Sequence, residues 1–474
     1  MLTRLEVDGF KNLLNFAVDF APFNCIAGPN GVGKSNIFDA IRFLSLLTEH
    51  KIIEAAQMVR GNGMEGSDLR DLFWSNSSER AAQFRIAAEM IVDKQVKDDF
   101  GRPAEATSTF LRYEIKIGYE EATSSTAMSH LTLLSETLNY ITKGEAARRL
   151  KFPHDVQSFR DRVITNNRRI KSGFISVETA DDGQTEIIVH QDGGSRGPGQ
   201  RAPANKAPST IVGTSNTSAT PTILAARREM QKWRFLALEP SAMRRPDRFQ
   251  DDTFVNANGG HLPATLYRLA SDAEKHRDDP ADVYAKVTNR LAGLVPISDI
   301  IVDVDAVRQL LTVQVKERTG ITLPAASLSD GTLRFLALSV LVVDSQSDGL
   351  ICIEEPENGI HPAKMAEMVR LLQDLAVNVH DAPGPDNPFR QVIVATHSPV
   401  FVKLINRNDL LCAIEAKVKT TNGLPTRTLR CRPLDDTWRS KAGEVSVGDG
   451  TLLAYLTDPP GVQLRLPSLL NGVE

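Results

Sequence analysis

The sequence predicts an α/β fold in which a mixed sheet is flanked by helices and carries an inserted α+β segment. Three observations lead to this prediction. A glycine-rich loop follows a short apolar run of strand type and opens a helix, a later apolar run ends in two glutamates, and another ends in a histidine. Strands and helices that alternate in this way form a sheet with helices on its faces.

The glycine-rich loop is the most specific of the three features. Residues 28–35 read Gly-Pro-Asn-Gly-Val-Gly-Lys-Ser and fit the G-x-x-x-x-G-K-[ST] phosphate-loop pattern. Residues 23–27 before it are apolar, and apolar residues from Ile37 to Leu47 recur at helical spacing. Backbone N–H groups and a helix N-terminus attract a phosphate, so we expect ATP or GTP here. The expected contacts come from Gly28, Pro29, Asn30, Gly31, Val32, Gly33, Lys34, which reaches the β/γ-phosphates, and Ser35, which ligates Mg²⁺.

Composition is that of an ordinary globular protein. The chain has 474 residues, enough for two or three domains, with 41% hydrophobic and 24% charged residues. No apolar run approaches the roughly 18 residues of a membrane span, and charges near the N-terminus do not fit a signal peptide. The four cysteines form no C-x-x-C pair, which favours buried thiols. We therefore expect a cytoplasmic protein without membrane contact.

Charge is unevenly placed along the chain. The net charge is −4, yet residues 141–250 hold 19 Lys/Arg against 11 Asp/Glu. This basic segment suggests contact with a polyanion such as DNA or RNA, with solvated surface charge as an equal alternative because no reader motif accompanies it. Its clusters are Arg148-Arg149, Arg168-Arg169 with Lys171, Arg227-Arg228 with Lys232 and Arg234, and Arg244-Arg245 with Arg248.

Changes in pattern divide the chain into four expected parts. Residues 1–92 form a first lobe with the phosphate loop, and residues 93–235 form the inserted basic arm segment. Within the arm, residues 192–221 are rich in Gly, Ser, Pro, Ala and Thr, which predicts a flexible loop. Residues 236–410 form a second lobe, and 411–474 a C-terminal extension. The absence of a sustained heptad argues against a long coiled-coil arm.

Further motifs in the two lobes contain residues that could contact the phosphates, the Mg²⁺ ion or the attacking water. Ser329 in Leu-Ser-Asp-Gly-Thr is a good N-cap for the apolar helix at 333–343, and Gly331 lets a phosphate approach that helix. The apolar run 350–353 delivers Glu354 and Glu355 to a strand end, where one acid can orient Mg²⁺ and the other can hold the attacking water. Another strand ends at His397, which could contact the γ-phosphate. Near the start, Phe10-Lys11-Asn12 places the polar groups of Lys11 and Asn12 where a nucleotide could contact them.

These motifs, in this order, resemble the ABC-type ATPase heads of the RecF/SMC-like superfamily, and more narrowly the compact bacterial AAA-type ATPases without long arms. The resemblance covers residues 1–50 and 326–400 well and 236–325 loosely. It implies a P-loop NTPase fold of the ABC/RecF/SMC-head type. The roles that it implies are a Walker A loop at 28–35 followed by Asn36, a signature motif at Leu328–Thr332, a Walker B strand ending at Glu354, a catalytic base at Glu355, a D-loop near Asn358–Pro362 and a switch histidine at His397.

The resemblance also implies how such a head works. Ser329 and Gly331 would contact the γ-phosphate bound by a second copy, so a homodimer would sandwich two ATP molecules and come apart after hydrolysis. The sequence departs from the family in three places. Glu354 replaces the usual aspartate, Asp330 replaces the second signature glycine, and the Q-loop glutamine that would complete the Mg²⁺ site is either Gln83 or, slightly favoured, Gln95.

The biological role is left open between two hypotheses. One is an ATPase that acts on DNA in repair or anti-phage defence, and the other is a nucleotide-gated sensor with slow hydrolysis, favoured by Glu354, that controls a separately encoded nuclease or effector. A nuclease within this chain is not expected, because no full set of spaced acids follows Pro399. A transporter subunit is disfavoured because 295 residues separate Lys34 from Ser329.

Overall fold

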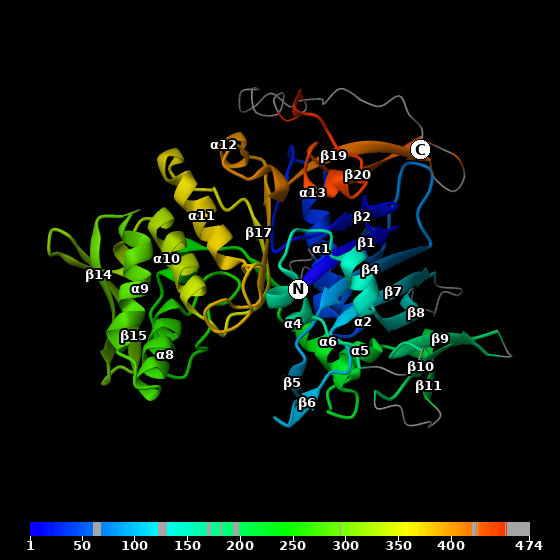
Figure 1. Cartoon of the computed structure of the whole chain (residues 1–474), viewed down its shortest axis with the longest axis horizontal. Helices are drawn as coiled ribbons and strands as arrows, with labels where there is room; N and C mark the ends of the chain where they lie inside the picture. Colours follow the sequence, from blue (N-terminus) through cyan, green and yellow to red (C-terminus); the bar gives the residue numbers. More distant parts are fainter. Residues whose placement is uncertain are drawn as a thin grey trace. The chain divides into compact units, whose positions relative to one another are not determined.

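The computed structural model forms two compact units. It describes residues 1–59, 68–121, 130–167, 172–180, 183–192, 199–293, 295–419, 423, 425–450 and 452. Unit 1 comprises Met1–Trp233, Asn378–Pro383 and Asn406–Glu474, and unit 2 comprises Arg234–Val377 and Gly384–Ile405. Figure 1 labels elements of both units where there is room. Among the described residues, no helix is both long enough and apolar enough to cross a bilayer.

Unit 1 is built around an antiparallel sheet of eight strands in the order β11-β10-β9-β8-β7-β4-β1-β2. A second group of strands in this unit pairs β3 in parallel with β19, and β19 in antiparallel fashion with β20. The strands are β1 (Leu2–Asp8), β2 (Phe16–Asp19), β3 (Phe23–Ala27), β4 (Gln83–Ile91), β7 (Phe110–Glu120), β8 (His130–Tyr140), β9 (Ile175–Thr179), β10 (Thr185–Val189), β11 (Gln200–Pro203), β19 (Leu410–Lys419) and β20 (Pro425–Pro433), with β5 (Gln95–Lys97) and β6 (Pro103–Glu105) forming a separate hairpin.

Unit 1 contains helix α1, which follows the phosphate loop, and helix α6, which packs against α1. The helices are α1 (Lys34–Leu46), α2 (Ile52–Met58), α3 (Lys143–Arg149), α4 (Asp161–Val163), α5 (Ile211–Thr214), α6 (Pro221–Gln231) and α13 (Trp438–Lys441), with short turns at η1 (Leu69–Leu72), η2 (Val156–Arg160), η3 (Ala204–Lys206) and η6 (Arg407–Asp409).

An aromatic cluster joins α1 to the large sheet. The ring of Phe84 on β4 lies 5.2 Å from that of Phe10 and 5.7 Å from that of Phe43 on α1, in edge-on geometry. Phe73 completes the cluster, 5.0 Å from Phe84. All four rings are buried, and edge-on aromatic pairs stabilise a core beyond the area that they bury. The cluster therefore fixes the start of the chain, next to Lys11, against the helix that carries the phosphate loop.

Unit 2 contains a parallel group of strands in the order β12-β17-β18 and a smaller antiparallel sheet in which β15 pairs with β13, β14 and β16. The strands are β12 (Arg234–Leu236), β13 (Asp247–Arg248), β14 (Ile297–Asp305), β15 (Leu310–Glu317), β16 (Thr322–Pro324), β17 (Gly349–Glu354) and β18 (Arg390–Thr396). The helices are α7 (Pro240–Met243), α8 (Leu262–Lys275), α9 (Pro280–Ala292), α10 (Asp330–Val343), α11 (Met365–Leu375) and α12 (Pro399–Val402), with short turns at η4 (Ala325–Ser327) and η5 (Pro362–Lys364).

The α/β class with mixed sheets flanked by helices is confirmed, and the divisions of the chain differ in part from those expected. The two units divide between Trp233 and Arg234, close to the expected border at 235/236. The arm segment 93–235 is not a body of its own, because its strands β7 and β8 extend the sheet of β1 and β4. Likewise the expected extension 411–474 begins with β19 and β20, which belong to the strands of unit 1.

Part of the segment 192–221, predicted as a flexible loop, has regular structure and tertiary contacts. Residues 200–203 form β11 and residues 211–214 form α5, while 193–198 lie outside the described residues. Thr210 is fully buried, and its hydroxyl donates to the carbonyl oxygen of Leu47 after α1. Gly- and Ser-rich composition alone does not show such tertiary anchors, so the segment resembles a loop in sequence.

The other anchor of this segment is a buried glutamate. Glu136 on β8 is fully buried, and its carboxylate accepts hydrogen bonds from the backbone N–H groups of Ile211 (2.6 Å) and Val212 (3.0 Å) and from the Tyr113 hydroxyl (3.1 Å). Burial raises the pKa of Glu136 from 4.5 to about 7 and outweighs these hydrogen bonds, which lower it. The carboxyl group therefore binds a proton in the folded chain under conditions in which the unfolded chain has lost it.

This shift predicts that the folded chain loses stability as pH rises from about 4.5 to about 7. Between these pH values the native state binds more protons than the unfolded state. Protonated Glu136 therefore contributes fully to the free energy of unfolding below pH 4.5, and this contribution is lost above pH 7. Since Glu136→Gln cannot titrate, unfolding by urea at several pH values should show a flatter pH dependence for it than for the wild type. The difference should be about 3 kcal/mol across the range. Parallel pH curves for the two proteins would contradict this account.

Candidate nucleotide site

The phosphate loop has the strand–loop–helix setting that its sequence predicts. It runs from β3, which is buried throughout, to α1, whose N-cap is Gly33 without any side-chain cap. Gly31 (φ 78°) and Gly33 (φ 100°) adopt backbone angles that favour glycine. The Lys34 ammonium group donates to the carbonyl oxygens of Gly28 (2.6 Å) and Pro29 (2.9 Å). The loop is thus folded around the lysine that would meet a phosphate.

The Phe10-Lys11-Asn12 motif lies directly against this loop. The Asn12 amide donates to the carbonyl oxygen of Val32 (3.0 Å), and its oxygen accepts from the Asn36 amide (2.8 Å). The Lys11 ammonium group pairs with Asp39 on α1 at 2.8 Å. A Cβ atom at Gly33 would lie 2.1 Å from the Asn12 amide nitrogen. Asn12 therefore supports the loop. The sequence did not predict this contact, because about twenty residues separate Asn12 from the loop residues that it contacts.

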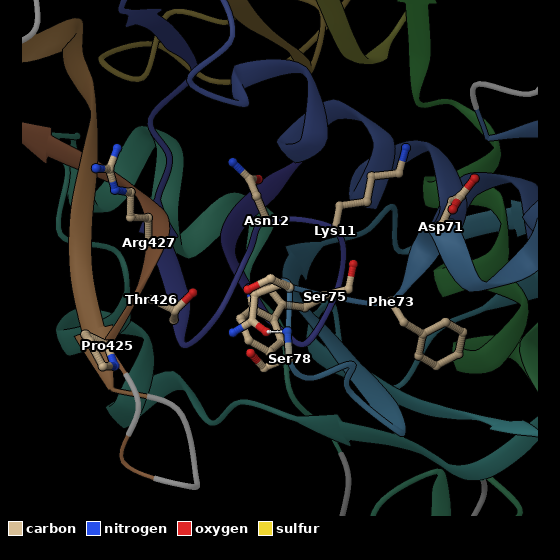
Figure 2. Close-up of a pocket in the computed structure, with 12 residues that line it drawn as sticks. Lys11, Asn12, Asp71, Phe73, Ser75, Ser78, Pro425, Thr426 and Arg427 are labelled. Carbon is tan, nitrogen blue, oxygen red and sulfur yellow. Dashed lines mark hydrogen bonds between the residues drawn. The ribbon is translucent and has the colours of Figure 1, made fainter.

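A pocket of about 680 Å³ opens beside Lys11 and Asn12. Figure 2 shows the three segments of unit 1 that line it, namely Lys11 and Asn12, Asp71 with residues 73–78, and residues 425–427 at the start of β20. Backbone hydrogen bonds hold the second segment in place, from the Lys11 N–H to the Leu72 oxygen (2.9 Å) and from the Trp74 N–H to the Gly9 oxygen (2.7 Å). The sequence motifs did not predict residues 71–78 and 425–427 as part of a site, because neither segment contains a recognisable motif.

Gln95 does not lie where the resemblance would need it. It begins β5 in the exposed β5–β6 hairpin, which packs on α6, and Figure 1 shows this hairpin projecting away from α1. Its side chain forms a hydrogen bond with Glu105 of the same hairpin. The alternative, Gln83, is exposed at the start of β4, near Gly9. The structure therefore gives no support to Gln95 as a magnesium ligand.

In unit 2 the signature motif forms the N-terminus of α10. Ser329 is the N-cap, and its hydroxyl accepts from the Thr332 N–H at 3.3 Å. Arg244 holds the motif from outside, since its guanidinium group donates to Asp330 (2.6 Å) and to the Leu328 oxygen (3.0 Å). Ser329 is exposed, so the start of a fourteen-residue helix is presented at the surface of the unit.

Parallel pairing brings the predicted acid and histidine residues of unit 2 together. Glu354 on β17 is in register with Ala395 on β18, and the N–H of Glu355 donates to the Ala395 oxygen at 2.8 Å. One oxygen of the Glu355 carboxylate lies 2.8 Å from Nδ1 of His397, and the other accepts from the Asn358 amide at 2.8 Å. Glu355 has a φ of 50°, which is unusual for a non-glycine residue and typical of functional sites.

Buried groups behind these residues support the strand ends. The Thr396 hydroxyl donates to the Glu357 carboxylate, and burial raises the pKa of Glu357. Burial also raises the pKa of the Cys352 thiol well above its ordinary value, and all four cysteines are free and buried as predicted. These thiols therefore act as small apolar core groups. Glu354, in contrast, is exposed at the end of β17.

The basic segment 141–250 carries less free charge than its sequence suggests. Acids outside the segment pair with its cations, at 2.6 Å for Lys151 with Asp19, 2.5 Å for Arg228 with Asp99 and 2.5 Å for Lys232 with Asp93. Arg149 likewise pairs with Glu89. Arg234 and Arg244 belong to unit 2, and the cluster at 168–171 lies outside the described residues. These ion pairs and the division between units argue against one continuous basic surface over the whole segment.

Two family models match the chain. One, described as an AAA domain, matches residues 4–146. The other, described as "AAA domain, putative AbiEii toxin, Type IV TA system", matches residues 207–403. Each model covers less than half of the chain, and both describe AAA domains, in agreement with the resemblance to ABC-type ATPase heads. Together the models span the phosphate loop, the signature motif and the two strand ends of unit 2.

Among curated proteins, Smc and RecF proteins are similar to short parts of this chain. A chromosome partition protein Smc of Bordetella petrii is 32% identical over 117 residues, which are 24% of this chain and 9% of the relative. A DNA replication and repair protein RecF of Parabacteroides distasonis is 35% identical over 96 residues, 18% of this chain and 26% of that protein. The matched part thus spans about a quarter or less of these relatives.

Solved structures of SMC heads are similar at low identity. An Smc head bound to the C-terminal winged-helix domain of ScpA superposes with a TM-score of 0.46 at 12% identity, covering 92% of this chain and 98% of that one. An Smc head of Pyrococcus furiosus with an extended coiled coil, bound to the C-terminal domain of ScpA, gives a TM-score of 0.42 at 12% identity, covering 90% of this chain and 96% of that one.

The contact between Gly33 and Asn12 yields a testable prediction. Gly33→Ala should raise the Kd for a fluorescent ATP analogue by about tenfold or more, because a Cβ adds backbone strain and displaces Asn12. Gly31→Ala is the matched control, since Gly31 has a similar positive φ and its added Cβ would meet nothing within 4 Å. Equal losses of affinity in the two variants would show that the bracing by Asn12 does not matter for binding.

Proposed function

We propose that the chain binds ATP with Mg²⁺, hydrolyses it, and pairs with a second copy while ATP is bound. The observation that carries this proposal is the placement of Glu355 beside His397 at neighbouring strand ends of unit 2. A carboxylate held by a histidine suits a group that accepts a proton from an attacking water. The family models and the phosphate loop of unit 1 support the nucleotide part of the proposal.

The phosphate loop would bind the triphosphate of ATP. The left-handed glycines and the uncapped start of α1 suit an anion, and Lys34 already lies over the loop. The pocket next to Asn12 has the volume expected of a small-molecule site and would take the nucleoside. The polar side chains of residues 75–78 at its edge, three serines and an asparagine, offer hydrogen bonds to a base or ribose.

The chemistry of the available donors fits Mg²⁺. The cation prefers oxygen ligands, and each unit offers one of the predicted donors: the Ser35 hydroxyl in unit 1 and the exposed Glu354 carboxylate in unit 2. Bound to such donors, Mg²⁺ would offset the charge that builds up on the phosphates. Glu355 would then hold and deprotonate the water, while His397 would fix the orientation of its carboxylate.

Association of two copies would complete each site. The exposed N-terminus of α10, with Ser329 and Gly331, presents backbone N–H groups suited to a phosphate oxygen of a nucleotide held by the other copy. The γ-phosphate would then bridge the two chains, and its loss on hydrolysis would release them. The chain would work in the cytoplasm, where ATP is abundant.

A role on DNA is proposed from the names of the relatives, which concern DNA repair and chromosome partition. The basic segment 141–250 would supply phosphate contacts through those cations that no acid neutralises. A further role in anti-phage defence, through a separately encoded nuclease or effector, would use the same ATP-dependent pairing.

The alternative, a nucleotide-gated sensor with slow hydrolysis, also rests on a specific observation. Both oxygens of Glu355 accept hydrogen bonds within unit 2, and the adjacent acid is Glu354 in place of the usual aspartate. Under this alternative the pair of copies persists long enough to recruit an effector. Steady-state ATP turnover with and without DNA distinguishes the two roles, because stimulation by DNA favours the first.

The central test uses Glu355→Gln. This variant should bind ATP as the wild type does, hydrolyse it at least about a hundredfold more slowly, and accumulate as a dimer in ATP and Mg²⁺. Light scattering after gel filtration gives the mass, with ADP as the nucleotide control. A Lys34→Ala variant should remain monomeric in ATP. If Glu355→Gln binds ATP and remains a monomer at every concentration, the proposed pairing is wrong.

A further inference from the structure

Two carboxylates and an imidazole meet in unit 2, and none of them has a part in the nucleotide chemistry described above. The residues are Asp247 on β13, Asp251 in the turn that follows it, and His261 directly before α8. Each offers one ligand atom such that all three atoms lie within 4.8 Å of one another. Nδ1 of His261 lies 3.0 Å from one oxygen of Asp247. Side chains from three short segments therefore converge on one small space.

Backbone contacts hold these three side chains in place. The Ala264 N–H donates to the second oxygen of Asp247 at 2.9 Å, and the Arg248 N–H donates to an oxygen of Asp251 at 2.7 Å. His261 leads the chain from the preceding loop into α8 with a φ of 65°, in the left-handed region. The folded unit thus positions the three groups in advance, which lowers the entropic cost of binding a ligand between them.

The donors and their spacing suit a divalent transition metal. In a tetrahedral zinc site, bonds of about 2.0–2.1 Å place two ligand atoms about 3.3 Å apart, close to the spacing of His261 and Asp247. Zn²⁺ accepts imidazole together with carboxylates, whereas Mg²⁺ prefers oxygen ligands alone. Asp247 is only 3% exposed, and burial raises the pKa of its carboxyl group. A bound cation would offset the solvation that this carboxylate has lost.

We propose that Asp247, Asp251 and His261 bind a Zn²⁺ ion, with water as the fourth ligand. The ion joins the turn after β13 to the start of α8 and closes the loop between Asp251 and His261. It also stabilises a segment that supports the signature motif, because Arg244 lies three residues before Asp247 and donates to Asp330 at 2.6 Å. The proposal goes beyond the nucleotide chemistry and does not depend on it.

The alternative is that Asp247 and His261 form only an ion pair at the start of α8. Such a pair needs neither Asp251 nor an imidazole in particular. His261→Asn separates the two accounts, because asparagine tolerates a positive φ and can donate to Asp247 but removes the imidazole ligand. Asp251→Asn is the second variant, since its amide oxygen can still accept from the Arg248 N–H while the negative charge is lost.

The experiment titrates the full-length chain, freed of metal with EDTA and without nucleotide, with ZnCl₂ in a calorimeter. We expect a Kd on the order of micromolar or lower, and a midpoint of thermal unfolding that rises with Zn²⁺. His261→Asn and Asp251→Asn should each raise the Kd by at least about a hundredfold and abolish the rise in midpoint. A roughly thousandfold excess of Mg²⁺ should not displace the zinc ion.

His276→Asn is the matched control. His276 is exposed at the other end of α8, where its ring bonds to the backbone oxygen of Asp272 at 2.7 Å, and this variant should bind Zn²⁺ as the wild type does. Wild-type Zn²⁺ affinity in both His261→Asn and Asp251→Asn, or a wild-type chain that does not bind Zn²⁺, would overturn the proposal. Displacement of Zn²⁺ by equimolar Mg²⁺ would overturn the imidazole as a ligand. Because no nucleotide is present, failure of the proposed ATPase leaves these outcomes unchanged.

Discussion

The parallel pairing of β17 with β18 is the interaction on which the chemistry of unit 2 depends. Register places Glu354 beside Ala395, and the hydrogen bond from the Glu355 N–H to the Ala395 oxygen continues the ladder past the end of β17. Both strands are buried along almost their whole length, so a slip by one residue would expose apolar side chains and bury acids. The burial that holds the strands in register thus also sets Glu355 beside His397.

In unit 1, the conformation of the phosphate loop is held by residues that are distant in sequence. The glycines of the loop do not restrict its backbone themselves. The aromatic cluster of Phe10, Phe43, Phe73 and Phe84 ties the beginning of the chain to α1, and Asn12 then contacts the loop at Val32 and Asn36. Packing of the core therefore determines the shape of a polar site, as is usual for sites on rigid scaffolds.

The sequence predicted those parts of the fold that depend on neighbouring residues in the chain. The phosphate loop, the apolar strands that end at Glu354 and Thr396, and the N-cap at Ser329 all follow from spacing and residue type. Tertiary contacts decided the rest. The segment at 200–214 is ordered because the buried Glu136 and the Leu47 carbonyl satisfy its polar groups, which composition cannot reveal. The pocket wall at 71–78 and the convergence of Asp251 with His261 also depend on residues brought together only by folding.

In the proposed mechanism, the nucleotide site in one copy is completed by a second copy. The most direct measurement is ATP turnover per chain at saturating ATP, as chain concentration rises from far below to far above the dimer dissociation constant found by light scattering. We expect very low turnover per chain at high dilution, rising to a plateau in step with the dimer fraction. A turnover per chain that stays constant while the protein passes from monomer to dimer would contradict it.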